Sequence, residues 1–160
     1  MHIWTVNDKK ETKFLRQKTA DFDFKKFSKL EIRELVKAMR QIMHRADGIG
    51  LSANQIGLNL NMFVAQVENK FYAIFNPKLI QISKDTEDFD EGCLSVPGVY
   101  GMATRPAKVT LVGFNQTGKA VKIKAWGLLA RVFQHEVGHL NGQLFTDIAK
   151  KVEKVEIPKP

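Results

Sequence analysis

Apolar residues recur at helical spacing in two long stretches of the chain. In the first they fall at Ile32, Leu35, Val36, Met39 and Met43. Residues three and four positions apart share one face of a helix, so this pattern predicts an amphipathic helix over about 28–46, with both methionines in the core. Ser28 and Glu31 form a capping-box pattern at its start, and Asp47-Gly48 provides a stop.

The second stretch begins near Ala125 and ends at Asn141-Gly142. Its apolar positions also follow the helical period, at Leu128, Leu129, Val132, Phe133, Val137 and Leu140. Between the two stretches lie four short runs rich in β-branched and aromatic residues, which predict two hairpins: 61–67 with 71–75, and 108–114 with 120–124. This order indicates an α+β fold of antiparallel β-sheets around a C-terminal helix. A chain of 160 residues fits one domain, 1–160.

The net charge of +8 is the most conspicuous feature of the composition. Basic residues are interspersed with acids, as at Lys29, Glu31, Arg33, Glu34 and Lys37. This mixture favours an ordinary solvated surface over a dedicated DNA-reading face, and we expect no specific DNA partner. A non-specific electrostatic attraction to a polyanion such as the ribosome is a further expectation.

The chain shows no secretion signal at its start and no run of about 18 to 20 apolar residues, so we expect a cytoplasmic protein without membrane contact. Cys93 is the single cysteine, which rules out an intrachain disulfide and favours a reducing compartment.

The predicted C-terminal helix contains the HExxH pattern at residues 135–139. His135 and His139 lie one turn apart on the same face, so both imidazoles can bind one metal ion. Glu136 is then placed to act as general base on a water at the ion. The alternative is a solvated histidine pair, which the strongly apolar character of this helix disfavours.

A catalytic metal with two histidines needs a third protein ligand. The metzincin pattern would require a histidine at the position of Phe145, so that class is rejected. A gluzincin would use a downstream glutamate, but only Glu153 and Glu156 follow, in a short tail. Cys93 is the remaining strong candidate, in a segment (91–98) that we interpret as a loop; an inert buried thiol is the alternative.

Gly48, Gly50 and Ala53 match the dinucleotide-binding pattern G-x-G-x-x-A. That pattern must follow a strand, whereas this segment follows the first predicted helix, so we reject the dinucleotide interpretation. A glycine-rich segment whose backbone approaches a ligand and which presents Gln55 fits better. A plain turn is the alternative.

Together the three segments resemble the peptide deformylase family, through the motifs at Gly48–Gln55, Glu91–Ser95 and Gln134–Leu140. The resemblance extends from Lys13 to Asp147. It implies removal of the formyl group from the N-terminal methionine of newly synthesised proteins, with release of formate. Nascent formyl-Met peptides would be the partners.

The resemblance also implies roles for individual residues. Cys93, His135 and His139 would hold one divalent ion, Fe(II) in the cell, with Zn, Ni or Co as replacements. Glu136 would act as general base and acid, while Gln55 and the backbone N–H of Leu94 stabilise the oxyanion. The substrate-binding residues implied are Ile49, Leu128 and Val132 around the methionine side chain, Gly50 and Gly98 along the peptide backbone, and Arg105 beside the site.

Two departures from the family pattern affect these expectations. Gly138 stands where the family usually has Asp, so we expect a less rigid or weaker metal site. After Lys154 the sequence is too short for the long C-terminal helix that some bacterial members use to dock on the ribosome. Two other functions stay open: an HExxH endopeptidase that cleaves unformylated peptides, and a non-catalytic basic binding domain on the same fold.

Overall fold

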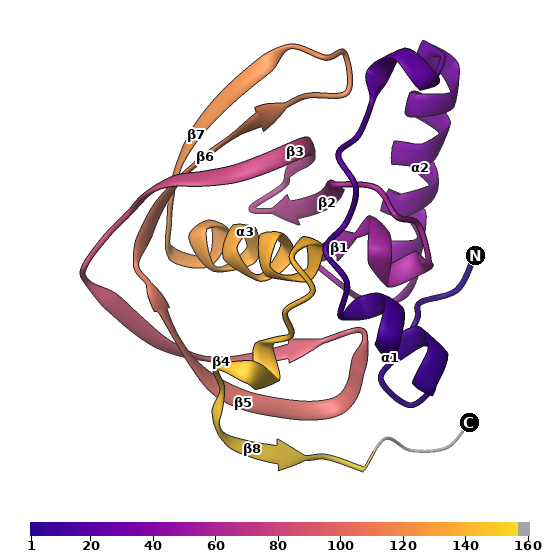
Figure 1. Ribbon diagram of the computed structural model, residues 1–160. Coiled ribbons are helices and arrows are strands. Elements are labelled where there is room, and N and C mark those ends of the chain that lie inside the picture. Colours follow the sequence, from indigo (N-terminus) through magenta and orange to yellow (C-terminus); the bar gives the residue numbers. More distant parts are fainter. Residues whose placement is uncertain (157–160) are drawn as a thin grey trace.

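The computed structural model describes residues 1–156, which form helices and two antiparallel sheets (Figure 1). The helices are α1 (Lys9–Leu15), α2 (Lys29–Arg45) and α3 (Gly127–Leu140), with short 3-10 helices η1 (Phe24–Lys26), η2 (Ala53–Ile56) and η3 (Phe145–Asp147). The strands are β1 (Gly50–Ser52), β2 (Met62–Val67), β3 (Lys70–Ile82), β4 (Thr86–Cys93), β5 (Val96–Pro106), β6 (Lys108–Phe114), β7 (Ala120–Trp126) and β8 (Lys150–Lys154).

The two sheets enclose α3. One sheet has the order β1-β2-β3-β6-β7 and the other the order β4-β5-β8. Every strand pair in these sheets is antiparallel, which confirms the predicted α+β class. Figure 1 shows α3 crossing the middle of the molecule, with the curved β6–β7 hairpin on one side and α2 on the other. None of the helices formed by residues 1–156 is long and apolar enough to cross a membrane.

The predicted start and core face of α2 are confirmed. Glu31 N donates to Ser28 Oγ at 3.2 Å, and Ser28 N donates to the Glu31 carboxylate at 2.7 Å, so both bonds of the capping box form. Met39 and Met43 are fully buried. The helix stops at the expected place, but Asp47 rather than Gly48 takes the left-handed backbone conformation, with φ 53°.

The boundaries of α3 and β3 differ from the prediction. We expected the last helix to begin near Ala125, but it begins at Gly127, because Ala125 and Trp126 still pair with β6 as the end of β7. β3 runs on to Ile82 after its pairing with β2 ends, because β6 takes over as its neighbour.

The expectation of a loop around Cys93 is wrong. Cys93 is the last residue of β4, a two-residue turn follows, and Val96 begins β5. Exposed and mostly acidic side chains occupy residues 86–90, so the apolar alternation that predicts a strand is missing there. Backbone pairing with β5 makes this segment a strand nonetheless. The same explanation applies to β8, which is exposed along its whole length.

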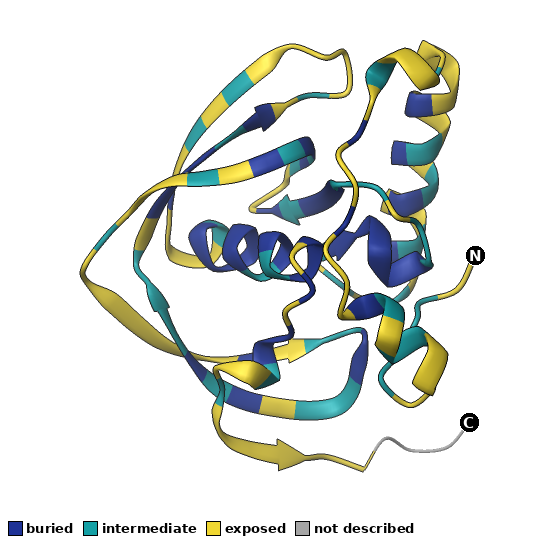
Figure 2. Ribbon diagram, in the orientation of Figure 1, coloured by how far each residue is buried: buried dark blue, intermediate teal, exposed yellow. Residues whose placement is uncertain are grey.

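The hydrophobic core holds α3 in place. The apolar face of this helix packs on β2, β3, β6 and β7, and Phe133 at its centre is fully buried. Phe133 makes edge contacts with Phe63 and Tyr72, at ring-centre distances of 5.8 and 5.4 Å. Figure 2 shows α3 as predominantly buried. A helix fixed in this way can position catalytic side chains accurately.

Candidate metal centre

Cys93, His135 and His139 converge on one point. Cys93 Sγ lies 3.1 Å from His139 Nε2, which lies 3.1 Å from His135 Nε2. The three ligand atoms all lie within 4.8 Å of one another. Cys93 comes from the end of β4, and the two histidines come from successive turns of α3. One thiolate and two imidazoles at this spacing form a donor set that fits a single first-row divalent ion and leaves a coordination position for water.

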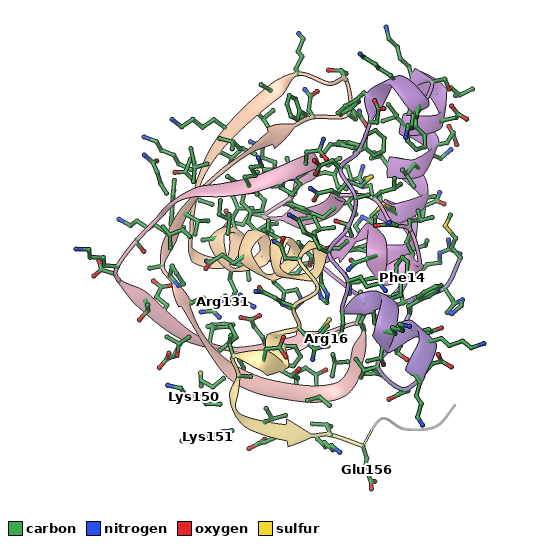
Figure 3. All side chains as sticks on the ribbon, in the orientation of Figure 1. Phe14, Arg16, Arg131, Lys150, Lys151 and Glu156 are labelled. Atoms are coloured by element: carbon green, nitrogen blue, oxygen red, sulfur yellow. The ribbon has the colours of Figure 1, made fainter. Side chains whose placement is uncertain are left out.

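A buried carboxylate orients His135. His135 Nδ1 donates to Glu91 Oε1 at 2.9 Å, which leaves Nε2 facing the other ligands. Arg105 contacts both oxygens of Glu91, at 2.6 and 2.8 Å, and Arg131 contacts Oε2 at 2.7 Å. The labelled side chain of Arg131 points from α3 toward the β4–β5 hairpin in Figure 3. His139 has no such partner among residues 1–156, where its Nδ1 is buried without a hydrogen bond.

These contacts set the charges around the ligands. Burial would raise the pKa of Glu91, but its bonds with Arg105 and His135 hold that pKa at about 2. Burial would also raise the pKa of the Cys93 thiol, but the charge on His139 and hydrogen bonds with both histidines lower it to about 5. Cys93 is therefore a thiolate at neutral pH, the form that binds metal.

Glu136 faces the same space from α3. Ser52 Oγ donates to Glu136 Oε2 at 2.6 Å and also lies 3.1 Å from the Glu136 backbone carbonyl, which can share the same hydroxyl proton. These contacts fix the side chain. Burial raises the pKa of Glu136, and the neighbouring histidine charges and the Ser52 bond offset only part of that rise. A carboxylate with a raised pKa in a buried site is suited to accept a proton and return it.

Gly50 leaves the space that Glu136 occupies. A Cβ at position 50 would collide with the Glu136 carboxylate. We therefore expect Gly50→Ala to displace this carboxylate and to lower kcat at least about ten-fold, because small misplacements of a catalytic group are costly. Turnover measured per bound metal ion checks this. An unchanged kcat would show that Glu136 moves aside without consequence.

Gln55 directs its amide donor toward Cys93 and Ser95. Gln55 Oε1 accepts from Ser52 N at 2.9 Å, which orients the amide within the short helix η2. Its Nε2 then donates to Ser95 Oγ at 3.1 Å and lies 3.7 Å from Cys93 Sγ. Leu94 directly follows Cys93 in the turn, so Gln55 and the Leu94 backbone lie at the same end of the site.

A cavity of about 620 Å³ joins these groups. The expected site residues that line it are Ile49, Gly50, Gln55, Cys93, Leu94, Gly98, Leu128, Val132, His135 and Glu136. His139 lies behind the lining and is buried. Arg105 is the expected substrate-binding residue that does not line this cavity. It lies behind the site instead, in its ion pair with Glu91.

Sequence reasoning missed several residues of the site. Glu91 is the first residue of the motif Glu91–Ser95, but no function was predicted for its side chain. Arg131 was detectable as a charge on the apolar face of α3, one turn before His135. Ser52 gave no signal of its own. Phe89 and Tyr100 line the cavity with large exposed side chains, from strands that the apolar pattern did not predict.

Replacement of Glu91 by Gln is expected to weaken metal binding by about 10- to 100-fold, because His135 loses the carboxylate that orients it. The matched control is Asp90→Asn, which removes an exposed charge from the same strand. Competition with a chelator, on proteins whose fold is checked by circular dichroism, measures the metal dissociation constant. Equal constants for both variants would contradict the role of Glu91.

The fold and the site together define a metal-dependent hydrolase of the HExxH type. The particular family follows from comparison with known proteins. The model of the family "Polypeptide deformylase" matches residues 1–155. A peptide deformylase from Carboxydothermus hydrogenoformans is 44% identical over 119 residues, which cover 74% of this chain and 78% of that protein.

Solved structures give the same result. The peptide deformylase from Synechococcus elongatus in complex with actinonin has a TM-score of 0.85 at 36% identity, covering 94% of this chain and 79% of that one. A probable peptide deformylase from Synechococcus phage S-SSM7 has a TM-score of 0.83 at 39% identity, covering 92% and 99%. The chain belongs to the polypeptide deformylase family, whose members remove the N-formyl group of nascent proteins in a metal-dependent reaction.

Proposed function

We propose that Cys93, His135 and His139 hold one divalent metal ion, Fe(II) in the cell, which Zn, Ni or Co can replace. The support is the convergence of one thiolate and two imidazoles beside Glu136 in one cavity. A thiolate lowers the effective charge of the ion and suits iron, while the same donors accept the other three metals. When bound, the ion polarises the formyl carbonyl and lowers the pKa of a water molecule.

Glu136 handles the protons of the reaction. Its Oε2 stays bonded to Ser52 Oγ, and the carboxylate lines the cavity. It accepts a proton from the attacking water and passes it to the leaving amine of the methionine, so that formate and a free N-terminus result. Gln55 Nε2 and the Leu94 N–H donate hydrogen bonds to the oxygen on which negative charge develops.

The substrate lies between β1 and β5, the strands that contribute Gly50 and Gly98 to the cavity lining. Ile49, Leu128 and Val132 form an apolar wall, which takes the methionine side chain. Gly50 and Gly98 bind the peptide backbone as an added strand. The backbone carbonyl of Gly98 already accepts a hydrogen bond from Val155 N at 2.7 Å. Gly98 therefore contacts the peptide through its backbone N–H. Arg105 acts as a positioning residue through Glu91.

The enzyme acts in the cytoplasm on nascent formyl-Met peptides, as one catalytic domain spanning residues 1–160. Its charge of +8 adds a non-specific attraction to the ribosome. A single assay separates this function from the two alternatives. Anaerobically prepared iron enzyme is incubated with a formyl-Met peptide, and its products are identified by mass spectrometry and a formate assay. Formate with an otherwise intact peptide supports deformylation, cleavage at internal bonds supports an endopeptidase, and no product supports a binding domain.

Gly138 weakens the metal site, because it places no carboxylate next to His139. A Cβ built at Gly138 meets only Gln143, at 3.6 and 3.8 Å, so a larger side chain fits. Gly138→Asp is expected to slow metal dissociation by up to about ten-fold. The control Gly138→Ala should raise the free energy of unfolding by about 0.5 to 1 kcal/mol without changing metal dissociation. Chelator-driven metal loss and urea unfolding measure the two effects. Equal metal dissociation rates for the Asp and Ala variants would contradict the proposal.

A further inference from the structure

The hairpin of β6 and β7 carries a row of lysines on one side. Lys124 pairs with Thr110, and Lys122 pairs with Val112. Lys108 pairs with Trp126 at the end of the hairpin. Residues that face each other across paired strands point to the same side of a sheet. Lys108, Lys122 and Lys124 therefore share one side, which we call the lysine face.

The lysine face points away from the core. The alternate residues of these strands pack in the cluster around α3; they are Val109, Leu111, Val121, Ile123 and Ala125. The three lysines are exposed. Figure 3 shows nitrogen-tipped side chains projecting outward from this hairpin, on the side away from α3. In Figure 1 the β6–β7 hairpin forms the outer edge of the molecule, on the side away from α2.

Among residues 1–156 the lysines of the lysine face form no ion pair. No Asp or Glu occurs from residue 92 to residue 135. The ion pairs formed by residues 1–156 involve arginine or histidine, and none involves a lysine. Acidic residues are concentrated at 85–91. Those from 87 to 91 lie on β4 of the other sheet, whereas the backbone of Asp85 contacts Ala107, next to Lys108. The hairpin therefore presents positive charge that no acidic residue of its own strands offsets.

An aromatic side chain lies beside these charges. Trp126 is 69% exposed and pairs directly with Lys108. Lys122 and Lys124 stand about 7 Å apart along β7, given the rise of an extended strand. Lysines that contact phosphates, combined with an exposed aromatic ring that stacks on a base, are the elements of RNA binding. A membrane surface would need a larger exposed apolar patch. The large apolar side chains exposed on this side are Trp126 and, at the other end of the hairpin, Phe114, which is 38% exposed.

We propose that the lysine face binds RNA, with the three lysines on phosphates and Trp126 stacked on an unpaired base. This inference rests on the ribosome attraction in the proposed function and gives it a defined surface. Trp126 immediately precedes α3, and Leu128, two residues later, lines the catalytic cavity. RNA bound to the lysine face therefore lies next to one edge of the catalytic cavity.

The test compares two triple variants of equal charge change. In the first variant Gln replaces Lys108, Lys122 and Lys124. In the second, called the α1 variant, Gln replaces Lys9, Lys10 and Lys13, which are exposed on α1. Fluorescence anisotropy measures binding to a labelled RNA hairpin with a single-stranded loop over a range of salt concentrations. The first variant should lose at least about ten-fold in affinity, and its salt slope should fall by about 2 to 3. The α1 variant should lose much less.

Trp126→Ala should weaken RNA binding without changing the salt slope, because stacking releases no counterions. The proposal would be overturned by equal losses of RNA affinity in the two triple variants or by the absence of RNA binding by the wild type in 50 mM salt. Tighter binding to anionic lipid vesicles than to RNA would also overturn it. Formate release from a free formyl-Met peptide should be unchanged in the first triple variant. Loss of RNA binding is thereby distinguished from failure of the catalytic function.

Discussion

Replacement of Glu136 by Gln is expected to lower the kcat for a formyl-Met peptide at least about 1,000-fold, with the metal still bound. Gln has the shape of Glu but cannot accept the proton of the attacking water, and such proton transfer contributes about 10²- to 10⁴-fold. The metal ligands are separate side chains, so metal content should not change. Formate release and metal analysis on the same preparation measure both quantities.

The control for this variant is Glu34→Gln, an exposed glutamate on α2 that should leave turnover unchanged. The pH profile provides a second readout. Burial raises the pKa of Glu136, and the base must be ionised to act. Wild-type activity should therefore fall as the pH drops through this raised pKa. Formate release by Glu136→Gln at the wild-type rate would rule out Glu136 as the base.

Replacement of Cys93 by Ala is expected to abolish stable metal binding and, with it, deformylation. The loss should exceed the roughly 10- to 100-fold cost of removing an outer partner of a metal site, because a direct ligand is gone. Wild-type protein should retain about one ion per chain after dialysis. The variant should retain almost none, as measured by inductively coupled plasma mass spectrometry.

Reversible metal removal is the control for Cys93→Ala. Chelation of the wild type should abolish turnover, and addition of the ion should restore it, whereas Cys93→Ala should not recover. Metal affinity of the wild type should also fall as the pH drops, first because His135, whose pKa is raised to about 10, holds a proton that the ion must displace, and more steeply below about 5, where the Cys93 thiolate becomes protonated. Full metal content in Cys93→Ala would show that another residue supplies the third ligand.

The helices α2 and α3 and four of the strands were predictable because burial leaves a period in the sequence. Met39 and Met43 mark the core face of α2, and Phe133 does the same for α3. The strands β4, β5 and β8 left no such period, since charged and exposed side chains occupy much of them. Their pairing depends on backbone bonds with partners elsewhere in the chain, which local patterns do not encode.

The proposed metal ligands were predictable for a different reason. HExxH is a local pattern, so His135, Glu136 and His139 were found from spacing on one helix. Cys93 followed from the need for a third ligand and from the resemblance of the three motifs to a family. The chemistry of that site requires specific residue types, which leave a clear trace in a sequence of 160 residues.

The residues that surround and orient His135 could not be predicted in the same way. Glu91 and Arg131 meet across 40 residues of sequence, and nothing in either segment indicates the contact. Arg105 was expected to contact substrate, but the fold turns it onto Glu91. Which basic residue pairs with which acid depends on how β4 and β5 pack on α3, and that arrangement emerges only in three dimensions.

X-ray absorption spectroscopy at the metal edge of the zinc-loaded enzyme tests the proposed metal centre directly. We expect one sulfur at about 2.3 Å and two imidazole nitrogens at about 2.0 to 2.1 Å from the ion. The sulfur signal should vanish in Cys93→Ala. A spectrum of the wild-type enzyme without sulfur in the first coordination shell would contradict the metal centre of Cys93, His135 and His139.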